Sequence, residues 1–198
     1  MKTNIGNYTD KQLLEKATQT HGFVAFPKDY WLLGIRSKED EPDVFDDKFY
    51  LFHSDKFVMV TSGTTNPGKY GLLNFKEYNS QGCAVVKADE WYNDLWAPGM
   101  HKGKMKALVQ VSDVLYYRDN DMDLKSDEIG QIYKGIIGIN FHTATYESKP
   151  NIIAKFVAWL IGKWAVGCQV CNVALDYYSI IRGVWGQKRI SYCLLNEF

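Results

Sequence analysis

The chain has 198 residues, of which 46% are hydrophobic and 15% aromatic, and its 23 Lys and Arg residues balance its 23 Asp and Glu residues. This length and apolar content predict one folded domain with a sizeable core, and they exclude a disordered chain. Because a net charge of zero supplies no excess of positive charge for nucleic acid or for an anionic membrane, we expect neither as a partner.

The chain carries no pattern typical of export or of a membrane anchor. Its first twelve residues are polar and lack the apolar stretch of a secretory signal peptide, so we expect synthesis in the cytoplasm. The most apolar run, Ile152 to Gly162, contains Lys155 and is shorter than the roughly 20 residues that cross a bilayer. Four cysteines are too few for a dense disulfide framework, and we expect at least one free thiol.

The first two thirds of the chain predict one helix followed by strands. Thr9 and Gln12 fit a capping box, which predicts a helix over 9–20 with Leu13 and Ala17 on one face. Alternating and β-branched segments then predict strands at Tyr30–Ser37, Lys48–His53, Phe57–Ser62, Ala84–Lys87, Ala107–Val111 and Val114–Arg118. Turn-forming residues separate them at Ser54–Asp55, Asn66–Gly68, Ser80–Gly82, Pro98–Gly99 and Asp119–Asp121.

The last third mixes strands and helices. Gly135–Thr143 reads as an apolar strand that ends in the polar pair His142 and Thr143. Pro150 suits the first turn of an amphipathic helix that includes Phe156–Ile161. A second helix is predicted over Cys171–Arg182 and a closing strand over Arg189–Leu195. We therefore predict a mainly β fold with helices (α+β), and we find no linker that divides the chain.

Cys168 is the cysteine best placed for nucleophilic chemistry. A thiol reacts as its thiolate, which needs a nearby base or a helix N-terminus. Cys168 follows Gly167, where the chain can turn tightly, and it precedes the predicted second helix, so the amides of both residues are expected to bind an oxyanion. His142 is the predicted base because it closes an apolar strand, whereas the other three histidines lie in polar or turn-rich surroundings.

The segments around these two residues resemble a known enzyme family. Gly138–Thr143, followed by Trp164–Cys168, is similar to the catalytic domain of the L,D-transpeptidases, which reads Gly-x-x-His-Gly/Thr and then Ser-x-Gly-Cys. Thr61–Gly68 resembles an early loop of that family, and the likeness covers roughly residues 30–196. Arg118–Asp121 and Trp164–Val170 are similar to motifs of uncharacterised phage-borne relatives.

This resemblance implies a β-sandwich or barrel with a short N-terminal helix and a helical insertion before the catalytic cysteine, so that 1–27 is a lead-in and 28–198 the catalytic domain. It implies that Cys168 attacks a peptide carbonyl of the peptidoglycan stem peptide and forms a thioester. His142 is then the base, oriented by Thr143, while Gly167 supplies an oxyanion amide. The residues expected to bind substrate are Arg118, Trp164, Gln169 and His101.

The same resemblance implies no cofactor and a phage-type lytic enzyme, which reaches the cell wall after release or as part of a phage particle. Three positions depart from the family pattern: Ala165, Val166 and Val170 stand where a serine, often a second histidine, and a basic residue are usual. Arg118 or Arg36 is expected to replace the basic residue. These departures leave open an alternative, a non-catalytic structural or cell-wall-binding phage protein that retains the fold.

Two further patterns leave metal or redox chemistry open. Cys168 and Cys171 form a Cys-x-x-Cys motif, which is found in dithiol sites and which needs further ligands, here His142 and His101, to bind zinc. Asp119, Asp121 and Asp123 alternate as ligands do in a calcium loop, although Leu124 replaces the usual glycine. An exposed acidic turn and a core-facing Cys171 are the interpretations that we prefer.

Overall fold

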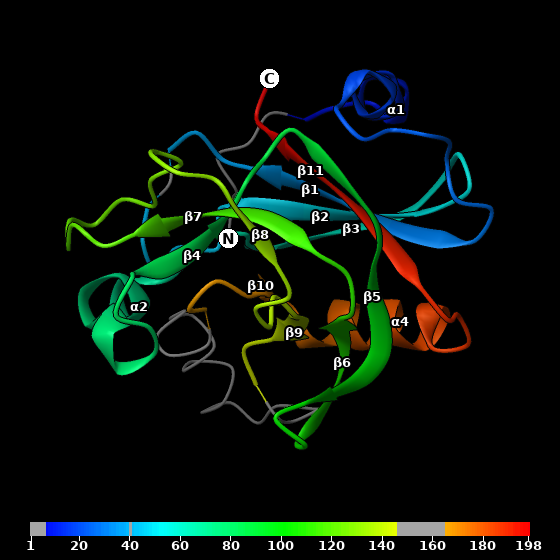
Figure 1. Cartoon of the computed structure of the whole chain (residues 1–198). Coiled ribbons are helices and arrows are strands. Elements are labelled where there is room, and N and C mark those ends of the chain that lie inside the picture. Colours follow the sequence, from blue (N-terminus) through cyan, green and yellow to red (C-terminus); the bar gives the residue numbers. More distant parts are fainter. Residues whose placement is uncertain (1–6, 40, 146–164) are drawn as a thin grey trace.

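The computed structural model describes residues 7–39, 41–145 and 165–198. Within them, eight strands close a barrel in the order β1-β11-β5-β6-β9-β10-β3-β2 (Figure 1). The bounds of these strands are β1 Tyr30–Arg36, β2 Asp47–His53, β3 Lys56–Thr64, β5 Glu90–His101, β6 Met105–Gln110, β9 Phe141–Thr143, β10 Gln169–Cys171 and β11 Ile190–Asn196. A second sheet has the order β4-β7-β8, with β4 Cys83–Val86, β7 Val114–Asp119 and β8 Tyr133–Gly135.

Helices accompany the two sheets. In the described residues they are α1 Asp10–Gln19, α2 Lys69–Asn74, the 3₁₀ helix η1 Phe75–Glu77, and α4 Ala174–Val184. The prediction of a mainly β fold with helices is therefore confirmed. The predicted capping box is also confirmed, since the Thr9 side chain accepts from the Gln12 amide and the Gln12 side chain accepts from the Thr9 amide. None of the described helices is long and apolar enough to cross a membrane.

The core lies inside the barrel and beneath α1. Phe49, Trp96 and Tyr192 are fully buried in the main cluster, where α4 contributes Tyr177. Leu13 and Ala17 of α1 pack onto a separate cluster that contains Trp31 of β1 and Trp91 of β5. The N-terminal helix therefore packs on the outer face of the β1–β11–β5 region and not beside the candidate catalytic residues His142 and Cys168.

One predicted turn lies inside a strand. Pro98 and Gly99 belong to β5 and pair with Leu108 and Ala107 of β6, so the turn prediction at this position was wrong. Strand β11 pairs with β5 only as far as Trp96. Beyond that point β5 has a single partner, and a proline without an N–H is tolerated in such an edge position. The consequence is a long β5–β6 hairpin whose tip carries His101 and Lys102.

The predicted strand over Gly135–Thr143 is divided into β8 and β9. Between them Gly138 has φ +85°, and the amides of Ile137 and Ile139 donate to the Gln110 side-chain oxygen at 3.0 and 2.8 Å. The Gln110 side chain thus accepts the hydrogen bonds that a neighbouring strand would otherwise accept. The hydrophobic pattern of the sequence does not predict this break in the strand. The segment ends at Asn140, directly before β9.

The predicted helix over Cys171–Arg182 begins later, at Ala174. Residues 169–171 instead form β10, which pairs in parallel with β9 and antiparallel with β3. Cys168 therefore precedes a strand, and the prediction that a helix N-terminus follows it was wrong. The amphipathic helix predicted around 150–161 and Trp164 lie outside the described residues.

Candidate active site

Three segments that are far apart in the sequence meet at one end of β9 and β10. The last residue of β5, at the hairpin tip, is His101, β9 contributes His142, and the residue before β10 is Cys168. A ring nitrogen of each histidine and the Cys168 sulfur all lie within 4.8 Å of one another. The parallel register, with Gln169 opposite Phe141 and Val170 opposite His142, aligns the two strands so that this grouping is possible.

Gly167 sets the position of Cys168. Its φ of +124° lies in the region that side chains other than hydrogen rarely adopt. A Cβ added there would lie 2.9 Å from the Ala84 carbonyl oxygen of the neighbouring sheet. The tight turn predicted at this glycine is therefore present, and it holds the cysteine between the barrel and the β4 strand.

His142 is fully buried, and its tautomer follows from one contact. Its Nδ1 lies 2.9 Å from the backbone carbonyl oxygen of Thr143. Because a carbonyl only accepts, Nδ1 carries the hydrogen, and in the neutral ring Nε2 is the nitrogen that takes up a proton. Thr143 thus orients His142 through its main chain, while its hydroxyl donates to the Cys171 carbonyl at 3.0 Å.

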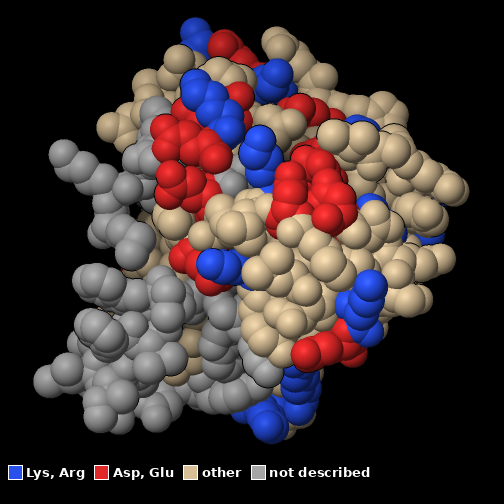
Figure 2. All heavy atoms as spheres, turned by 90° about the vertical axis from the view of Figure 1, so that its left-hand side faces the viewer, with Lys and Arg blue, Asp and Glu red and all other residues tan. Residues whose placement is uncertain are grey.

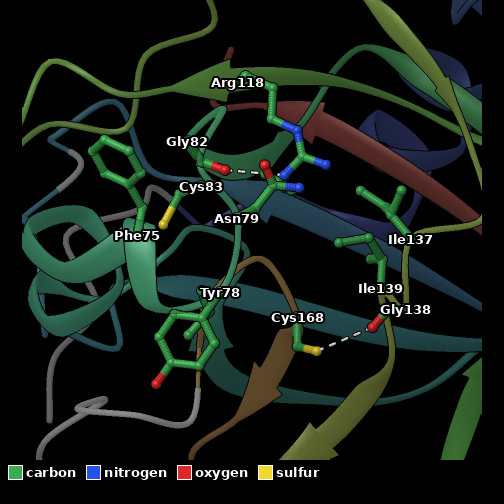
Figure 3. Close-up of a pocket in the computed structure, with 12 residues that line it drawn as sticks. Phe75, Tyr78, Asn79, Gly82, Cys83, Arg118, Ile137, Gly138, Ile139 and Cys168 are labelled. Carbon is green, nitrogen blue, oxygen red and sulfur yellow. Dashed lines mark hydrogen bonds between the residues drawn. The ribbon is translucent and has the colours of Figure 1, made fainter.

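Cys168 is a partly exposed thiol at rest. Its Sγ donates to the Gly138 carbonyl oxygen at 3.4 Å (Figure 3). Burial of the sulfur raises the pKa of the Cys168 thiol, while the Asn140 backbone N–H and the charge of Lys102 act in the opposite direction. Because burial has the largest effect, the resting sulfur is protonated, and a nucleophilic thiolate needs a base beside it.

A pocket of about 270 Å³ opens beside the cysteine. Its lining comes from β4 and β7 of the second sheet, from η1 and the loop after it, and from the segments that precede β9 and β10, and includes Tyr78, Asn79, Arg118, Ile137, Ile139 and Cys168. In Figure 3 Arg118 descends from β7 on one side of this pocket and Cys168 lies on the other. The two residues are therefore placed to contact the same bound molecule.

Arg118 is partly buried and has unused hydrogen-bonding capacity. One guanidinium nitrogen donates to the Gly82 carbonyl at 3.0 Å, and the group lies over the Tyr116 ring at 4.9 Å. Its buried Nε has no hydrogen-bond partner, and no carboxylate forms an ion pair with it, in the residues that the structure describes. A partly buried guanidinium of this kind is suited to an anionic ligand group.

Gln169 and Arg36, which were also predicted to contact substrate, are engaged inside the protein. Gln169 is fully buried, where it accepts from the Tyr192 hydroxyl at 2.8 Å and donates to the Thr65 carbonyl at 3.2 Å, so we assign it a role in the core. Arg36 is also buried, pairs with Glu128, and contacts Thr65. It is thus not a substitute for the missing basic residue.

Cys171 does not join the site. Its sulfur lies 3.6 Å from the Thr61 hydroxyl and 3.6 Å from the Val173 carbonyl oxygen, and burial raises its pKa to about 12. The four cysteines are free thiols. Among the described residues, Cys171 is not in the group of potential metal ligands that contains Cys168. That group consists of His101, His142 and Cys168.

The acidic loop after β7 is arranged differently from the predicted set. Asp121, Asp123 and Asp127 offer oxygens within 4.8 Å of one another. Asp119 instead accepts from the Asp127 amide at 3.1 Å, and burial raises its pKa to about 6. Calcium binding at Asp119, Asp121 and Asp123 stays a prediction. Figure 2 shows acidic and basic side chains interspersed on this side of the molecule, which presents no continuous basic surface.

Sequence reasoning missed Asn140 and Lys102. Asn140 offers its backbone N–H to the Cys168 sulfur, and Lys102 adds a positive charge nearby. The only sequence signal for Asn140 was its place within the Gly138–Thr143 motif, and Lys102 lay in a segment that was not predicted as a hairpin tip.

Comparisons of the chain with known protein families, with curated proteins and with solved structures each found no match. A functional assignment therefore has to be argued from the residues of the site.

Proposed function

We propose that this protein is a cysteine acyl-transfer enzyme that acts on the stem peptides of peptidoglycan, with Cys168 as nucleophile and His142 as base. The observation that carries the proposal is the meeting of a partly exposed thiol with a buried histidine whose Nδ1 donates to the Thr143 carbonyl. A thiol, a base and a group that orients the base are the three parts of a cysteine nucleophile.

The reaction follows from these groups. The Cys168 thiol turns from the Gly138 carbonyl towards His142, whose Nε2 takes its proton. The thiolate attacks a peptide carbonyl and forms a carbon–sulfur bond, and collapse of the tetrahedral intermediate breaks the carbon–nitrogen bond. Protonated His142 returns the proton to the leaving amine. Water or a second amine then attacks the thioester and releases the acyl group.

The raised pKa of Cys168 is compatible with this scheme because a base is present. A thiolate formed only when substrate has displaced the Gly138 contact protects the free enzyme against oxidation. It also means that the reaction depends strongly on His142, since little thiolate exists without it.

The pocket supports a peptide substrate that carries a carboxylate. Stem peptides of peptidoglycan contain free carboxylates next to peptide bonds, and Arg118 presents its guanidinium to the pocket that Cys168 lines. Charge-assisted hydrogen bonds to a carboxylate are about twice as strong as neutral ones. We propose that Arg118 binds such a carboxylate and thereby places the adjacent carbonyl at the Cys168 sulfur.

The direct test is to incubate the purified protein with defined peptidoglycan fragments and to identify the products by mass spectrometry. Shortened stem peptides indicate hydrolysis, and newly joined peptides indicate transfer to an amine. Both are expected to vanish in Cys168→Ala and to persist in the matched control Cys171→Ala, whose sulfur lies outside the site. No turnover over a broad set of fragments would contradict the proposal and favour a non-catalytic protein that retains the fold.

A further inference from the structure

The two histidines of the site have opposite hydrogen-bonding arrangements. His142 donates from Nδ1 to a carbonyl, as described above. His101 has its Nδ1 3.1 Å from the side-chain nitrogen of Asn140. Because an amide NH₂ group only donates, Nδ1 of His101 is an acceptor and the hydrogen of the neutral ring is on Nε2. His142 is thus built as a base and His101 as a donor.

The orientation of the Asn140 amide is itself fixed. Its side-chain oxygen accepts from the Gln110 backbone N–H at 2.9 Å. If the amide were turned over, two donors would face each other at Gln110, and a buried donor without an acceptor costs about 1–3 kcal/mol. A chain of three groups, from Gln110 through Asn140 to His101, therefore selects the tautomer of His101.

The surroundings keep His101 neutral. The side chain is buried, and both burial and the neighbouring Lys102 lower the pKa of His101. Its ring stacks on the ring of His142 with centroids 4.2 Å apart. A positive charge on His101 would repel the imidazolium that forms when His142 accepts the thiol proton. A neutral His101 allows His142 to do so.

A metal site is the other use of these side chains, and it fits less well. A histidine that binds a metal offers a lone pair, and its second nitrogen donates to an acceptor. His142 satisfies this rule through Thr143. His101 does not, because Asn140 donates to the very nitrogen that would have to carry the hydrogen.

We propose that His101 is a further catalytic residue, which donates its Nε2–H to the negative charge that develops beside Cys168, with Asn140 as the residue that positions it. This inference rests on the proposed cysteine chemistry. It assigns to the β5–β6 hairpin tip the stabilisation of the tetrahedral oxyanion, together with the Asn140 backbone N–H, which stabilises the thiolate.

The tautomer can be measured directly and needs no substrate. Long-range ¹H–¹⁵N NMR correlations of the histidine side chains at neutral pH distinguish Nδ1–H from Nε2–H rings. We expect His142 as the Nδ1–H form and His101 as the Nε2–H form, assigned with single His→Gln variants. A His101 ring with its hydrogen on Nδ1, or a charged ring at neutral pH, would overturn the inference even if the protein is an active peptidase.

Variants test the function of the donor. His101→Leu removes it, whereas His101→Gln retains an N–H near the same position. We expect His101→Leu to lower kcat about 10²- to 10³-fold, as the loss of one oxyanion donor does elsewhere, and His101→Gln to restore part of that loss. We also expect slower alkylation of Cys168 in His101→Leu, which is measurable without peptidoglycan.

These readouts separate the two claims. If wild-type protein turns over no peptidoglycan fragment but His101→Leu still slows alkylation of Cys168 and His101→Gln restores it, the donor role stands and only the substrate is wrong. Unchanged kcat and unchanged alkylation in a folded His101→Leu protein, judged by its circular dichroism, would overturn the role of His101. A loss that is equal in His101→Leu and His101→Gln would likewise assign the effect to packing and overturn it.

Discussion

A cysteine lies at each end of strand β10, one directly before it and one as its last residue, and the two have contrasting surroundings. Cys168 precedes the strand, is partly exposed, and lies with two histidine nitrogens near its sulfur beside a pocket. Cys171 ends the strand and is fully buried in the core, where its sulfur lies 3.6 Å from both the Thr61 hydroxyl and the Val173 carbonyl oxygen. Two residues, Gln169 and Val170, thus separate a thiol that can be activated from one that fills the core.

What separates them is access to a base and to negative-charge stabilisation, not the ordinary acidity of the thiol. Burial raises the pKa of both cysteines. Only Cys168 has a neighbouring histidine, an offsetting positive charge and an opening towards a ligand. A Cys-x-x-Cys motif that runs along a strand thus places its two sulfurs in different environments, whereas the same motif in a turn would bring them together.

The largest expected effect separates the two cysteines. Cys168→Ala should reduce turnover of peptidoglycan fragments by about 10⁶-fold, because removal of a covalent nucleophile leaves only the contribution of binding and charge stabilisation. Cys171→Ala should keep turnover within a few-fold of wild type. The measurement is initial rate by quantitative mass spectrometry. Comparable losses in both variants, with both proteins folded, would remove the distinction between the two sulfurs.

His142→Ala should lower kcat by about 10⁴-fold, at the upper end of general-base contributions, since the Cys168 thiol has a raised pKa and yields little thiolate alone. His53→Ala is the matched control, because His53 lies at the exposed end of β2. Initial rates at saturating substrate make the comparison. A His142→Ala enzyme as active as the control would mean that another group takes the proton.

Arg118→Ala should reduce kcat/KM by about 10- to 100-fold for a substrate with a free carboxylate, which corresponds to the loss of one charged hydrogen bond. Amidation of that carboxylate should cause a similar loss in wild type and no further loss in the variant. Arg182→Ala, on the exposed face of α4, serves as the control. If Arg118→Ala lowers kcat/KM relative to wild type by the same factor for the amidated substrate as for the free carboxylate, Arg118 does not bind the carboxylate.

A smaller effect concerns pH and alkylation. Iodoacetamide should modify Cys168 in the native protein and spare Cys171, whose pKa of about 12 keeps it protonated. Because burial raises the pKa of Cys168, its thiolate fraction and its alkylation rate should go on increasing with pH beyond the ordinary thiol pKa of 9.0. Peptide mapping after timed reaction provides the profile. A plateau below that pH would indicate a thiolate already stabilised at rest.

Gln169 provides the smallest expected effect, and it is on stability. Gln169→Leu leaves the Tyr192 hydroxyl without its acceptor and the Thr65 carbonyl without its donor. Loss of such buried hydrogen bonds should lower the free energy of unfolding by about 1–3 kcal/mol, measured by denaturant titration. KM should stay near the wild-type value. A large rise in KM without loss of stability would restore the prediction that Gln169 binds substrate.

Local patterns were sufficient for much of the fold. The Thr9–Gln12 capping box and most of the barrel strands could be predicted, because they depend on residues close together in the sequence. Strand β5, Glu90–His101, was not predicted at all, and its continuation through Pro98 depends on where β11 stops pairing. The break at Gly138 could not be predicted either, because the Gln110 side chain replaces a strand there.

The site shows the same limit. Cys168 and His142 stood out through their flanking residues, and the structure brings them together. The partnership of His101 with Asn140 joins residues 39 positions apart and depends on the length of the β5–β6 hairpin. Arg118 reaches the pocket from the second sheet. Contacts between residues so far apart in the sequence depend on the topology of the sheets, which local residue patterns do not predict.

The most direct test of the central claim is to trap the acyl-enzyme. Wild-type protein is mixed with a defined stem peptide, quenched in acid within the first turnover, and mapped by mass spectrometry. The account predicts an added acyl group on Cys168 that hydroxylamine releases, with Cys171 unmodified. Turnover of the peptide without an adduct on Cys168, or with the acyl group on another residue, would contradict it.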